Sequence, residues 1–332
     1  MAPLAHVSIA PATAVGTSQP QSSAAKGAKR LAILVSPTDL LSPSSLSSLA
    51  HFSGVAAELG LQTTLIGEGD LSRLAEFDGL FIRQTTSVGG VAHRFSLRAR
   101  SLGMPVLDDP NSIVYGSNKI IQHGLLVSHG IEVARTIIAS SREAVREAVR
   151  LFGLPLVLKI PDGCYCRGVE KAETLSQGEE IAARMLSFGK KILLQEFLPT
   201  PFDWRIGVLD GAPLFACKYH MVPGHWQGVA RGVKGSFVNG PVEPVALPSV
   251  PDGIIEIALR AARCVGRGIY GVDVKETARG PVVIEVNDNP DMDRDVETGA
   301  NPEAWQRLAG WFTKAMSAVD GGSRPRLIAP AP

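Results

Sequence analysis

Short apolar runs alternate with longer, helix-like runs in the first third of the chain. Four short runs have the length and composition of buried strands: Leu31–Ser36, Thr63–Ile66, Leu80–Arg83 and Met104–Leu107. Two longer runs lie between them, Ser44–Leu59 and Val91–Leu102, and each is followed by a glycine of the kind that ends helices. Alternating strands and helices predict a parallel sheet covered on both faces.

After residue 112, helices and strand pairs follow one another without that regular alternation. Helices are predicted within four ranges: Ile113–Gly130, with Ser117 or Asn118 as the cap, Ser141–Leu151, with a serine cap, Asp252–Val265 and Pro302–Val319. Buried strands are predicted over Leu154–Ile160 and Ile192–Leu198. A hairpin is expected around Asp210 and Gly211, because this pair is typical of a tight turn.

A second hairpin is predicted further along, and it carries the polar residues around which the chain is organised. Its strands are Tyr270–Lys275 and the start of Val282–Asp293, joined by a turn centred near Arg279. Regular alternation places Val282, Ile284 and Val286 on one face and Val283, Glu285 and Asn287 on the other. Asp273 is expected opposite Glu285, and directly paired residues share a face.

Asp273, Glu285 and Asn287 are therefore expected to form one oxygen-rich cluster. Opposed carboxylates repel each other unless a cation lies between them. Carboxylate and amide oxygens suit a hard cation such as magnesium. The alternative interpretation is the exposed polar face of a surface hairpin, but the repulsion between the two acids favours a cation site.

Composition restricts the class of protein. With 332 residues, 45% of them hydrophobic, the chain can bury a sizeable core in two or three units. The net charge of +1, without a basic run or an interleaved aromatic surface, argues against nucleic acid as a partner. No apolar run reaches the length of a membrane span. Four cysteines in a chain of this length indicate reduced thiols, so we expect a cytoplasmic protein.

Two lysines are candidates for binding phosphate. No glycine fingerprint follows the first predicted strand and no GxxxxGK[ST] loop occurs, which argues against a nicotinamide dehydrogenase and a P-loop kinase. Lys159 instead ends an apolar strand before the glycine-bearing loop Pro161–Gly168, an arrangement that can grip phosphates. The alternative is a lysine paired with a structural carboxylate. Lys119 lies in the first turn of a helix, where a cation opposes the helix dipole, so it is either functional or merely solvated.

The segment Lys218–Gly240 is polar, glycine-rich and basic. His220 and His225 have a spacing that zinc could use, but no cysteine or carboxylate stands at a matching distance. An anion-binding loop, with Lys218 and Arg231 among its cations, is the better interpretation.

In order, the chain carries a lysine on a strand, a glycine loop, QEF, DWR, a cation-ended strand, GVD and EVNDNP. This series resembles the ATP-grasp ligases, specifically the RimK-type branch that joins a carboxylate to an amine. Segments such as DDPNSIVYGSNK, QEFLPTPFDWRIGVLDG and YGVDVKET are similar to the C-terminal part of RimK-family proteins that carry a long N-terminal extension. The resemblance extends over residues 80–315.

The resemblance implies an ATP-grasp fold of mixed α/β and α+β class, with an N-terminal parallel-sheet domain in front of two units that clamp ATP. We expect this N-terminal domain at residues 29–112, the lid and central subdomain at 113–194, and the C-terminal subdomain with the metal site at 195–319. Residues 1–28 and 320–332 lack periodicity and are expected to be tails.

The resemblance also implies roles for individual residues. Lys159 and Lys119 would bind the phosphates of ATP. Backbone groups of a hinge would bind its adenine, and the hinge consists of Gln195, Glu196, Phe197 and Leu198. Two further polar side chains would contact the nucleotide, Asp203 and Asn239. One or two magnesium ions, with manganese as the alternative, would be held by Asp273, Glu285 and Asn287. Arg205, Lys218 and Arg231 would face the transferred phosphate and the acyl group.

The implied activity is an ATP-dependent ligase that forms an amide or peptide bond through an acyl phosphate, without a protein nucleophile. Its partners would be small amino-acid or peptide substrates, while a protein acceptor and a homo-oligomer stay open. The alternatives are a non-catalytic ATP-binding module and an ATP-grasp enzyme of different chemistry. Acidic substrates are one hypothesis, because several arginines have no evident role: Arg83, Arg94, Arg205 and Arg231.

Two features depart from the family pattern. Cys164 and Cys166 occupy lid-loop positions where this branch usually carries serines, and a thiol is a poorer hydrogen-bond donor than a hydroxyl. RimK itself has an arginine before its asparagine and glycines after it, whereas this chain has SFVNG at residues 236–240. The second departure leaves the acceptor site, and any specificity for glutamate, undetermined.

Overall fold

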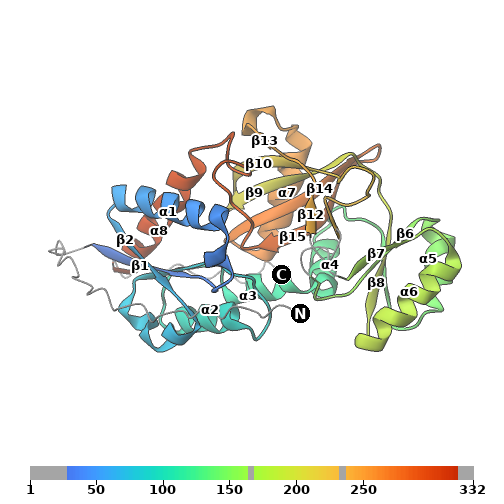
Figure 1. The fold of residues 1–332 in the computed structure, drawn as a ribbon, viewed down its shortest axis with the longest axis horizontal. Coiled ribbons are helices and arrows are strands. Elements are labelled where there is room, and N and C mark those ends of the chain that lie inside the picture. Colours follow the sequence, from blue (N-terminus) through green and yellow to red (C-terminus); the bar gives the residue numbers. More distant parts are fainter. Residues whose placement is uncertain (1–27, 164–167, 232–236, 321–332) are drawn as a thin grey trace, which may run out of the picture.

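A computed structural model describes residues 28–163, 168–231 and 237–320. Within these ranges the strands form three sheets of four or five strands and one two-stranded ribbon. Figure 1 shows the parallel sheet at one end of the molecule, the five-stranded sheet in the middle and the other four-stranded sheet at the far end. None of the helices in the described ranges has the length and apolar character needed to cross a membrane.

The N-terminal sheet is parallel, with the strand order β2-β1-β3-β4. Its elements are β1 (Lys29–Leu34), 3-10 helix η1 (Asp39–Leu41), α1 (Pro43–Glu58), β2 (Leu61–Ile66), 3-10 helix η2 (Glu68–Glu76), β3 (Gly79–Ile82), α2 (Val91–Ser101) and β4 (Val106–Leu107). Alternate residues of β1 pack on opposite sides, Ile33 in the core with Phe52 of α1 and Leu34 in the core with Phe95 of α2. The predicted parallel sheet with two covered faces is therefore confirmed.

The last helix, α8 (Ala304–Asp320), returns to this N-terminal sheet. Phe312 of α8 lies against Phe81 of β3, with ring centroids 5.5 Å apart, and shares its core with Phe52 of α1. Figure 1 shows α8 beside α1 at the end of the molecule that holds the first strands. The end of the described chain thus stabilises the unit formed by its beginning.

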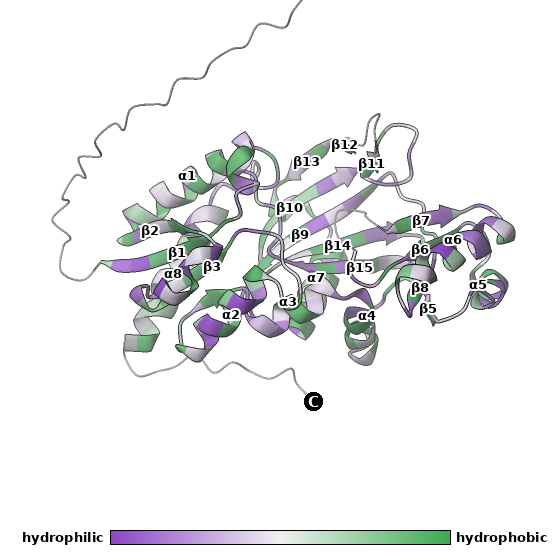
Figure 2. Cartoon of the chain, turned by 60° about the horizontal axis from the view of Figure 1, so that its bottom comes forward, coloured by the Kyte–Doolittle hydropathy of each residue, from purple (hydrophilic) through white to green (hydrophobic). Residues whose placement is uncertain are grey.

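The other four-stranded sheet is antiparallel, in the order β5-β8-β6-β7. Its elements are β5 (Thr136–Ala139), α5 (Ala144–Phe152), β6 (Leu156–Lys159), β7 (Val169–Ala172), α6 (Leu175–Phe188) and β8 (Ile192–Glu196). In Figure 2, α5 and α6 show both hydrophobic and hydrophilic colouring, as expected of helices that bury one face against a sheet. The predicted serine cap of α5 is wrong, because the helix begins later and its capping position is Glu143.

The five-stranded sheet has the order β13-β10-β9-β14-β15 and is antiparallel throughout. Its elements are β9 (Phe202–Leu209), β10 (Ala212–His220), β13 (Val242–Val245), 3-10 helix η4 (Leu247–Ser249), α7 (Asp252–Val265), β14 (Ile269–Thr277) and β15 (Gly280–Asp288). The ribbon beside the sheet consists of β11 (Val229–Arg231) and β12 (Phe237–Asn239). The predicted turn between β9 and β10 is confirmed: Asp210 and Gly211 both have positive φ, 50° and 78°.

One face of this sheet is apolar and is covered by α7. Trp204, Ile206, Val272 and Val286 share a core with the helix. The opposite face carries the polar residues of the sheet that alternate with these four. This division decides which of the predicted site residues meet.

The face assignment predicted for β15 is partly wrong. A β-bulge interrupts its pairing with β14: Asp273 pairs with Glu285, but Val274 pairs with Val283, so Ile284 is the extra residue. Val283 therefore packs in the α7 core beside Val286 instead of sharing a face with Glu285. A prediction from regular alternation cannot include an extra residue. The bulge therefore reverses the predicted face of the β15 residues that precede Ile284.

Two helices connect the N-terminal sheet to the rest of the molecule, α3 (Pro110–Ser117) and α4 (Lys119–Ser128). The single helix predicted within Ile113–Gly130 is interrupted at Asn118, whose backbone is extended. The side-chain oxygen of Asn118 accepts hydrogen bonds from the N–H groups of Ile120 and Ile121, both at 3.1 Å. Of the two predicted caps, Asn118 is therefore the one that begins α4.

Candidate active site

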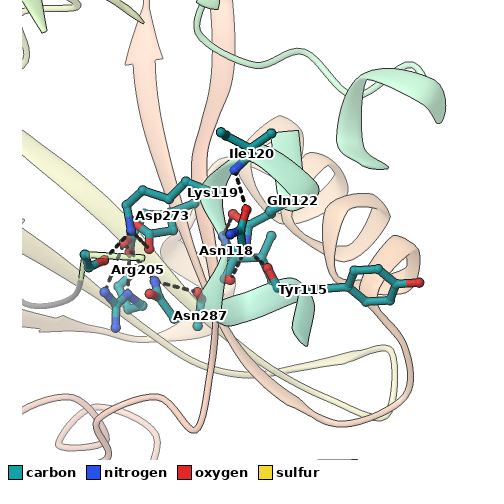
Figure 3. Close-up of polar contacts among 12 residues, drawn as sticks. Tyr115, Asn118, Lys119, Ile120, Gln122, Arg205, Asp273 and Asn287 are labelled. Atoms are coloured by element: carbon teal, nitrogen blue, oxygen red, sulfur yellow. Dashed lines mark hydrogen bonds and ion pairs between the residues drawn. The ribbon is translucent and has the colours of Figure 1, made fainter. Parts of the chain in front are cut away.

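The predicted acidic cluster is brought together on the polar face of the five-stranded sheet. Asp273 of β14 and Glu285 of β15 are directly paired, as the sequence predicts. The amide nitrogen of Asn287 donates to Asp273 Oδ2 at 3.1 Å and to the carbonyl oxygen of Gly271 at 3.3 Å. Figure 3 shows Asp273 and Asn287 next to one another.

Each carboxylate of the cluster is paired with a cation from a different element. Arg205 of β9 donates through both Nε and Nη2 to the carboxylate of Asp273, and the Nη2–Oδ2 distance is 3.0 Å. Lys119 of α4 donates through Nζ to Glu285 Oε1 at 2.9 Å. In Figure 3, Lys119 reaches from its helix toward the group formed by Arg205, Asp273 and Asn287. The two pairings remove the repulsion that the opposed acids would otherwise have.

The pKa values of the two acids move in opposite directions. Burial raises the pKa of Asp273, although the charge of Arg205 opposes this effect. Burial also acts to raise the pKa of Glu285, but the charges of Lys119 and Lys159 outweigh it, so the pKa of Glu285 is lowered. Glu285 is therefore an anion at neutral pH that two lysines attract.

Asp273, Glu285 and Asn287 fit a hard divalent cation. They present carboxylate and amide groups on one face, which is the donor set that magnesium prefers. In the described ranges no group of three or more His, Cys, Asp or Glu side chains is arranged to hold a metal ion. A magnesium ion here would therefore depend on Asn287 and on phosphate oxygens in addition to the two carboxylates, as is usual at nucleotide sites.

Gln122 of α4 holds that helix against β15, and sequence reasoning missed it. Its side chain donates to the carbonyl oxygen of Val286 at 2.6 Å and accepts from the N–H of Val286 at 2.8 Å. Val286 lies between Glu285 and Asn287, and Gln122 lies one turn after Lys119. The contact therefore places Lys119 within reach of Glu285. An amide three residues after Lys119, among apolar neighbours, was the available signal.

The start of α4 also holds the glycine loop that follows β6. The backbone N–H of Lys119 donates to the carbonyl oxygen of Pro161 at 2.9 Å, and Lys119 Nζ donates to that of Gly163 at 2.6 Å. Asn118 Nδ2 donates to Asp162 Oδ1 at 2.7 Å. Lys119 thus connects the loop to Glu285, which explains a cation at a helix N-terminus. The rest of the loop, including Cys164 and Cys166, lies outside the described residues.

Lys159, at the end of β6, is a buried cation with only 8% of its surface exposed. No carboxylate among the described residues lies within salt-bridge distance of it, so the predicted alternative of a structural ion pair finds no support there. Burial lowers its pKa to about 8, with Glu285 opposing the shift and Lys119 adding to it. An anionic ligand would strongly stabilise the charged form of such a buried lysine.

Lys159 and Lys119 line one pocket, which lies between α4, the antiparallel four-stranded sheet and β15. The other lining residues are Gln122, His123, Leu126, Val133, Leu193, Gln195, Val283 and Ile284. His123, which no motif indicated, has a lowered pKa because of burial and the charge of Lys159. Its imidazole is therefore neutral at pH 7, so the two lysines carry the positive charge of this pocket.

The predicted hinge is only partly at this pocket. Gln195 lines it and donates to Thr136 Oγ1 at 3.0 Å. Glu196 is buried and forms ion pairs with Arg135 and Arg279, both at 2.7 Å. Those two pairs show that the Glu196 side chain holds β8 to its neighbours instead of facing a ligand.

The remaining hinge residues, Phe197 and Leu198, follow β8. The ring of Phe197 packs edge-on against Trp226 at 5.9 Å, and Lys171 Nζ lies 4.8 Å from the Phe197 ring. Asp203 is also engaged: it forms an ion pair with Lys275 at 2.5 Å and accepts a hydrogen bond from Thr200 at 3.0 Å. Sequence reasoning missed Lys275, which shares the polar face of β14 with Asp273.

The structure does not bring Lys218 to the cluster. Lys218 pairs with Trp204, which lies on the apolar face, and its Nζ is 5.3 Å from that ring. Its ion-pair partner is Glu243 of β13 at 2.9 Å. The prediction that Lys218 faces the transferred phosphate is therefore wrong, because its strand parity turns it to the face opposite Arg205.

Two further predicted residues lie on the ribbon beside the sheet. Asn239 is exposed on β12 and lines a second, more open pocket, so the structure does not place it with Lys159. Arg231 ends β11, where it pairs with Phe237. The part of the predicted anion-binding loop at residues 232–236 lies outside the described residues.

A network after β15 joins the N-terminal sheet to the site, and Asn289 is its centre. Asn289 has a positive φ of 46°. Its side chain accepts from Arg83 at 2.7 Å and donates to the carbonyl oxygen of Gln84 at 2.7 Å. Its backbone N–H donates to Asp108 at 3.0 Å. The second asparagine of the EVNDNP motif therefore fixes the two units relative to each other.

The model of the RimK-like ATP-grasp domain matches residues 116–305. A probable alpha-L-glutamate ligase of Parasynechococcus marenigrum (strain WH8102) is 28% identical over 234 residues, which cover 69% of this chain and 47% of the relative. A protein with the same name from Alcanivorax borkumensis is 26% identical over 245 residues, which cover 73% of this chain and 78% of the relative. This chain spans about half the length of the Parasynechococcus relative and of two Shewanella relatives with that name.

Solved structures show the same fold. A RimK domain ATP-grasp protein from Sphaerobacter thermophilus matches with a TM-score of 0.64 at 20% identity, covering 85% of this chain and 98% of that one. A D-alanine–D-alanine ligase from Bacillus anthracis matches with a TM-score of 0.68 at 15% identity, covering 89% and 99%. The predicted ATP-grasp fold with an N-terminal parallel sheet is confirmed.

Proposed function

This chain belongs to the RimK-like ATP-grasp domain family, and from that premise we propose that it is an ATP-dependent carboxylate–amine ligase. It would form an amide or peptide bond through an acyl phosphate and release ADP and phosphate. The observation that carries this proposal is the pairing of Asp273 with Glu285, each held by a cation, close to the buried Lys159, which has no carboxylate partner among the described residues. The naming of curated relatives as probable glutamate ligases supports the same reaction class.

ATP is the proposed nucleotide, with its phosphates toward Lys159 and Lys119. Both lysines line the same pocket, and Lys159 lacks a carboxylate partner in the described ranges. A bound phosphate would stabilise the charged form of Lys159, whose pKa burial has lowered to about 8. The adenine would lie beyond Gln195, at the backbone of Phe197 and Leu198, with Asp203 as a further contact. A protein with this fold, the Bacillus anthracis ligase, has been solved in complex with ATP.

Asp273, Glu285 and Asn287 are the proposed ligands of one or two magnesium ions, with manganese as the alternative. When bound, the metal supplies charge neutralisation at the transferring phosphoryl group. Lys119 and Arg205 now occupy the positions of counter-ions to the two acids. Once a divalent ion replaces them there, both side chains can turn to the phosphoryl oxygens, which need further neutralisation.

The reaction needs no nucleophile from the protein. The substrate carboxylate attacks the γ-phosphorus, ADP leaves, and an amine then attacks the acyl carbon and displaces phosphate. Arg205 is held at the centre of the polar face between Asp273 and the ring of Tyr219, 4.8 Å from its guanidinium. From there it would position the acyl phosphate, and Arg231 remains a predicted contact on the ribbon. The substrates would be amino acids or peptides.

Three further statements stay predictions that follow from the sequence. The division at residues 29–112, 113–194 and 195–319 rests on the family resemblance. The cytoplasmic location rests on cysteine usage, and both cysteines in the described ranges, Cys217 and Cys264, are free and buried. Self-association and a protein acceptor remain open to experiment.

Mass spectrometry of a reaction with magnesium, ATP and a mixed pool of amino acids tests the activity. We expect a new ion at the mass of two substrates less water, together with ADP. ADP that forms without dependence on any amine would support phosphotransfer or carboxylation instead. ATP-dependent thermal stabilisation without ADP from any pool of acids and amines would support a non-catalytic module.

A further inference from the structure

The second pocket lies between the N-terminal sheet and the loop that leaves β15. Its walls include Phe81 and Gln84 on one side and Asp291 and Asp293 on the other. This loop begins directly after Asn287 of the acidic cluster. The cluster is close, because Arg205 lies against Pro290: a Cβ atom on Gly271 would meet side-chain atoms of both at 2.9 Å. A substrate in this pocket would thus lie beside the proposed reaction centre.

The side chains that line the second pocket are strongly acidic. The carboxylates are Asp39, Asp291, Asp293 and Glu297. Among the described lining residues, the cation is Arg83, and it already donates to Asn289 at 2.7 Å and to the carbonyl oxygen of Pro290 at 2.9 Å. Asp291 has no hydrogen bond or ion pair with any described residue. Among the described lining residues the carboxylates therefore outnumber the cation, while Arg205 of the acidic cluster acts on Asp291 from outside the lining.

A buried amide of the same pocket also lacks a partner. Gln84 is only 7% exposed, and its backbone carbonyl oxygen accepts a hydrogen bond from Asn289 at 2.7 Å. Its side-chain amide makes no hydrogen bond within the described part of the chain. The amide of this largely buried side chain lines the pocket, so a ligand that supplies both a donor and an acceptor can bind to it.

The acids of this pocket are not arranged as a metal site. In the described ranges no three His, Cys, Asp or Glu side chains are grouped so that they could hold a metal ion. Such an arrangement suits an organic cation, which can contact several separated carboxylates at once. Ser44 and Ser45 of the first turn of α1 also line the pocket. Their position suits the carboxylate of an amino acid, since helix N-termini favour anions.

We infer that the second pocket binds the amine substrate of the ligase, and that this substrate is a basic amino acid with a second positive charge on its side chain. This inference rests on the proposed function. An acidic side chain such as that of glutamate would meet four carboxylates, and like charges across a binding surface are strongly unfavourable. Three of the arginines considered for acidic substrates already have partners: Arg83 lines this pocket and donates to Asn289, Arg205 is paired with Asp273, and Arg94 with Glu68 at 2.6 Å.

The decisive experiment compares amino acids that differ mainly in side-chain charge. Binding of L-lysine, L-ornithine, L-arginine, L-norleucine and L-glutamate is measured by calorimetry on the full chain with magnesium and a non-hydrolysable ATP analogue. We expect at least one basic amino acid to bind about tenfold or more tightly than norleucine, and glutamate to bind more weakly than norleucine. No preference for any of the three basic amino acids, or no binding at all, overturns the inference.

Variants then assign the preference to the pocket. Asp291→Asn together with Asp293→Asn should reduce the preference for the basic amino acid over norleucine to within about threefold. Asp295→Asn is the matched control, because this residue lies on the same loop, is exposed and does not line the pocket. A preference that survives the double variant, or that is lost equally in the control, overturns the assignment.

Turnover separates this inference from the function on which it rests. Selective binding of a basic amino acid without amide formation from any acid would contradict the ligase proposal and its amine substrate, but not the binding specificity. Amide formation that prefers glutamate to every basic amino acid would contradict only the specificity inferred here.

Discussion

Two pairs of acids, one half-buried and one buried, lie near the same hairpin, and the protein balances their charge by different means. Asp273 and Glu285 are each bound to a cation, Arg205 and Lys119. Asp108 instead accepts hydrogen bonds from two backbone N–H groups, those of Ile269 at 2.7 Å and Asn289 at 3.0 Å.

The other acid of this second pair is Asp288 of β15, which has no cation partner among the described residues. Its Oδ2 atom is buried without a hydrogen-bond partner there. Burial raises the pKa of Asp288 to about 7. Burial, together with the charge of Asp288, raises the pKa of Asp108 well above its ordinary value.

The difference shows that burial alone does not make a carboxylate functional. In the first pair the neighbouring cations act to lower the pKa of each acid, and under the proposed function a metal ion would take their place. The pair without cations is driven toward the neutral form, which suits a structural role between two units. Substitutions in the two pairs should therefore separate activity from stability.

The largest expected effect is on catalysis by the cation-balanced pair. Glu285→Gln keeps the shape of the side chain but removes the charge that balances Lys119 and would bind the metal ion. We expect the rate of ADP formation at saturating substrates to fall by about a hundredfold or more. Glu243→Gln is the control, because Glu243 also pairs with a lysine but lies on β13, away from the cluster. Near-normal turnover of the Glu285 variant, measured on folded protein, would disprove the site.

The next effect concerns the buried Lys159, which lacks the partner that Lys119 has. Its pKa in the folded state is about 8, below the ordinary value of 10.5, so the unfolded chain holds this proton more strongly. The charged form therefore destabilises the folded state below pH 8, and stability is regained as the pH rises from 8 toward 10.5. We expect Lys159→Met to raise the free energy of unfolding at pH 7 by up to about 3 kcal/mol relative to wild type.

Urea unfolding of wild type and variant at pH 7 and pH 10 measures this difference, which should be smaller at pH 10. The same substitution at Lys275, which is paired with Asp203, is the matched control and should destabilise the protein at pH 7. Destabilisation by Lys159→Met at pH 7 would indicate a partner for this lysine and would weaken the case for a phosphate contact.

A smaller effect is expected in the pair without cations. Asp108→Asn places an amide N–H group against one of the two backbone N–H groups that the carboxylate accepts. We expect the free energy of unfolding to fall by about 1–3 kcal/mol, with an unchanged rate of ADP formation per folded molecule. Asp109→Asn is the control: Asp109 caps α3, asparagine also caps helices well, and this variant should therefore lower the free energy of unfolding less. Loss of activity without loss of stability in Asp108→Asn would reverse the assignment of the two pairs.

The smallest effect is expected from the lysine on the other face of the sheet. Lys218→Met removes a partly exposed ion pair with Glu243, which still has His220 as a partner at 2.8 Å. We expect turnover within about twofold of wild type and a change in the free energy of unfolding below about 1 kcal/mol. A tenfold loss of turnover would mean that Lys218 reaches the face of the acidic cluster when substrates are bound.

The pairing of Asp273 with Glu285 was predicted from the sequence, but the turn alone does not produce it. The register that continues from Lys275 and Val282 would place Asp273 opposite Ile284, and the bulge brings Glu285 there instead. The bulge at Ile284 was not predictable, since an extra residue in one strand leaves no mark in an apolar run. Lys218 was misplaced for a related reason: a cation at a strand end is visible in the sequence, but the face it takes depends on pairing with Trp204.

The family resemblance brought Lys119 and Arg205 to the predicted site, but their pairing with the two acids could not be predicted. Arg205 and Lys119 come from β9 and α4, far from β15 in the sequence, and the clamp of Gln122 on Val286 decides how close Lys119 comes. Asn289 likewise contacts Arg83 and Gln84 across 205 or more positions. No local pattern records which distant segment will supply the second half of such a contact.

The sequence by itself determined most of the strands and helices, the parallel N-terminal sheet and the family, because periodicity, turns and short motifs act over a few residues. Tertiary structure alone decided that α8 covers the N-terminal sheet, that each acid of the cluster has its own cation, and that a second, acidic pocket adjoins them. These features depend on how units pack, and packing brings together side chains whose spacing along the chain carries no information about their distance.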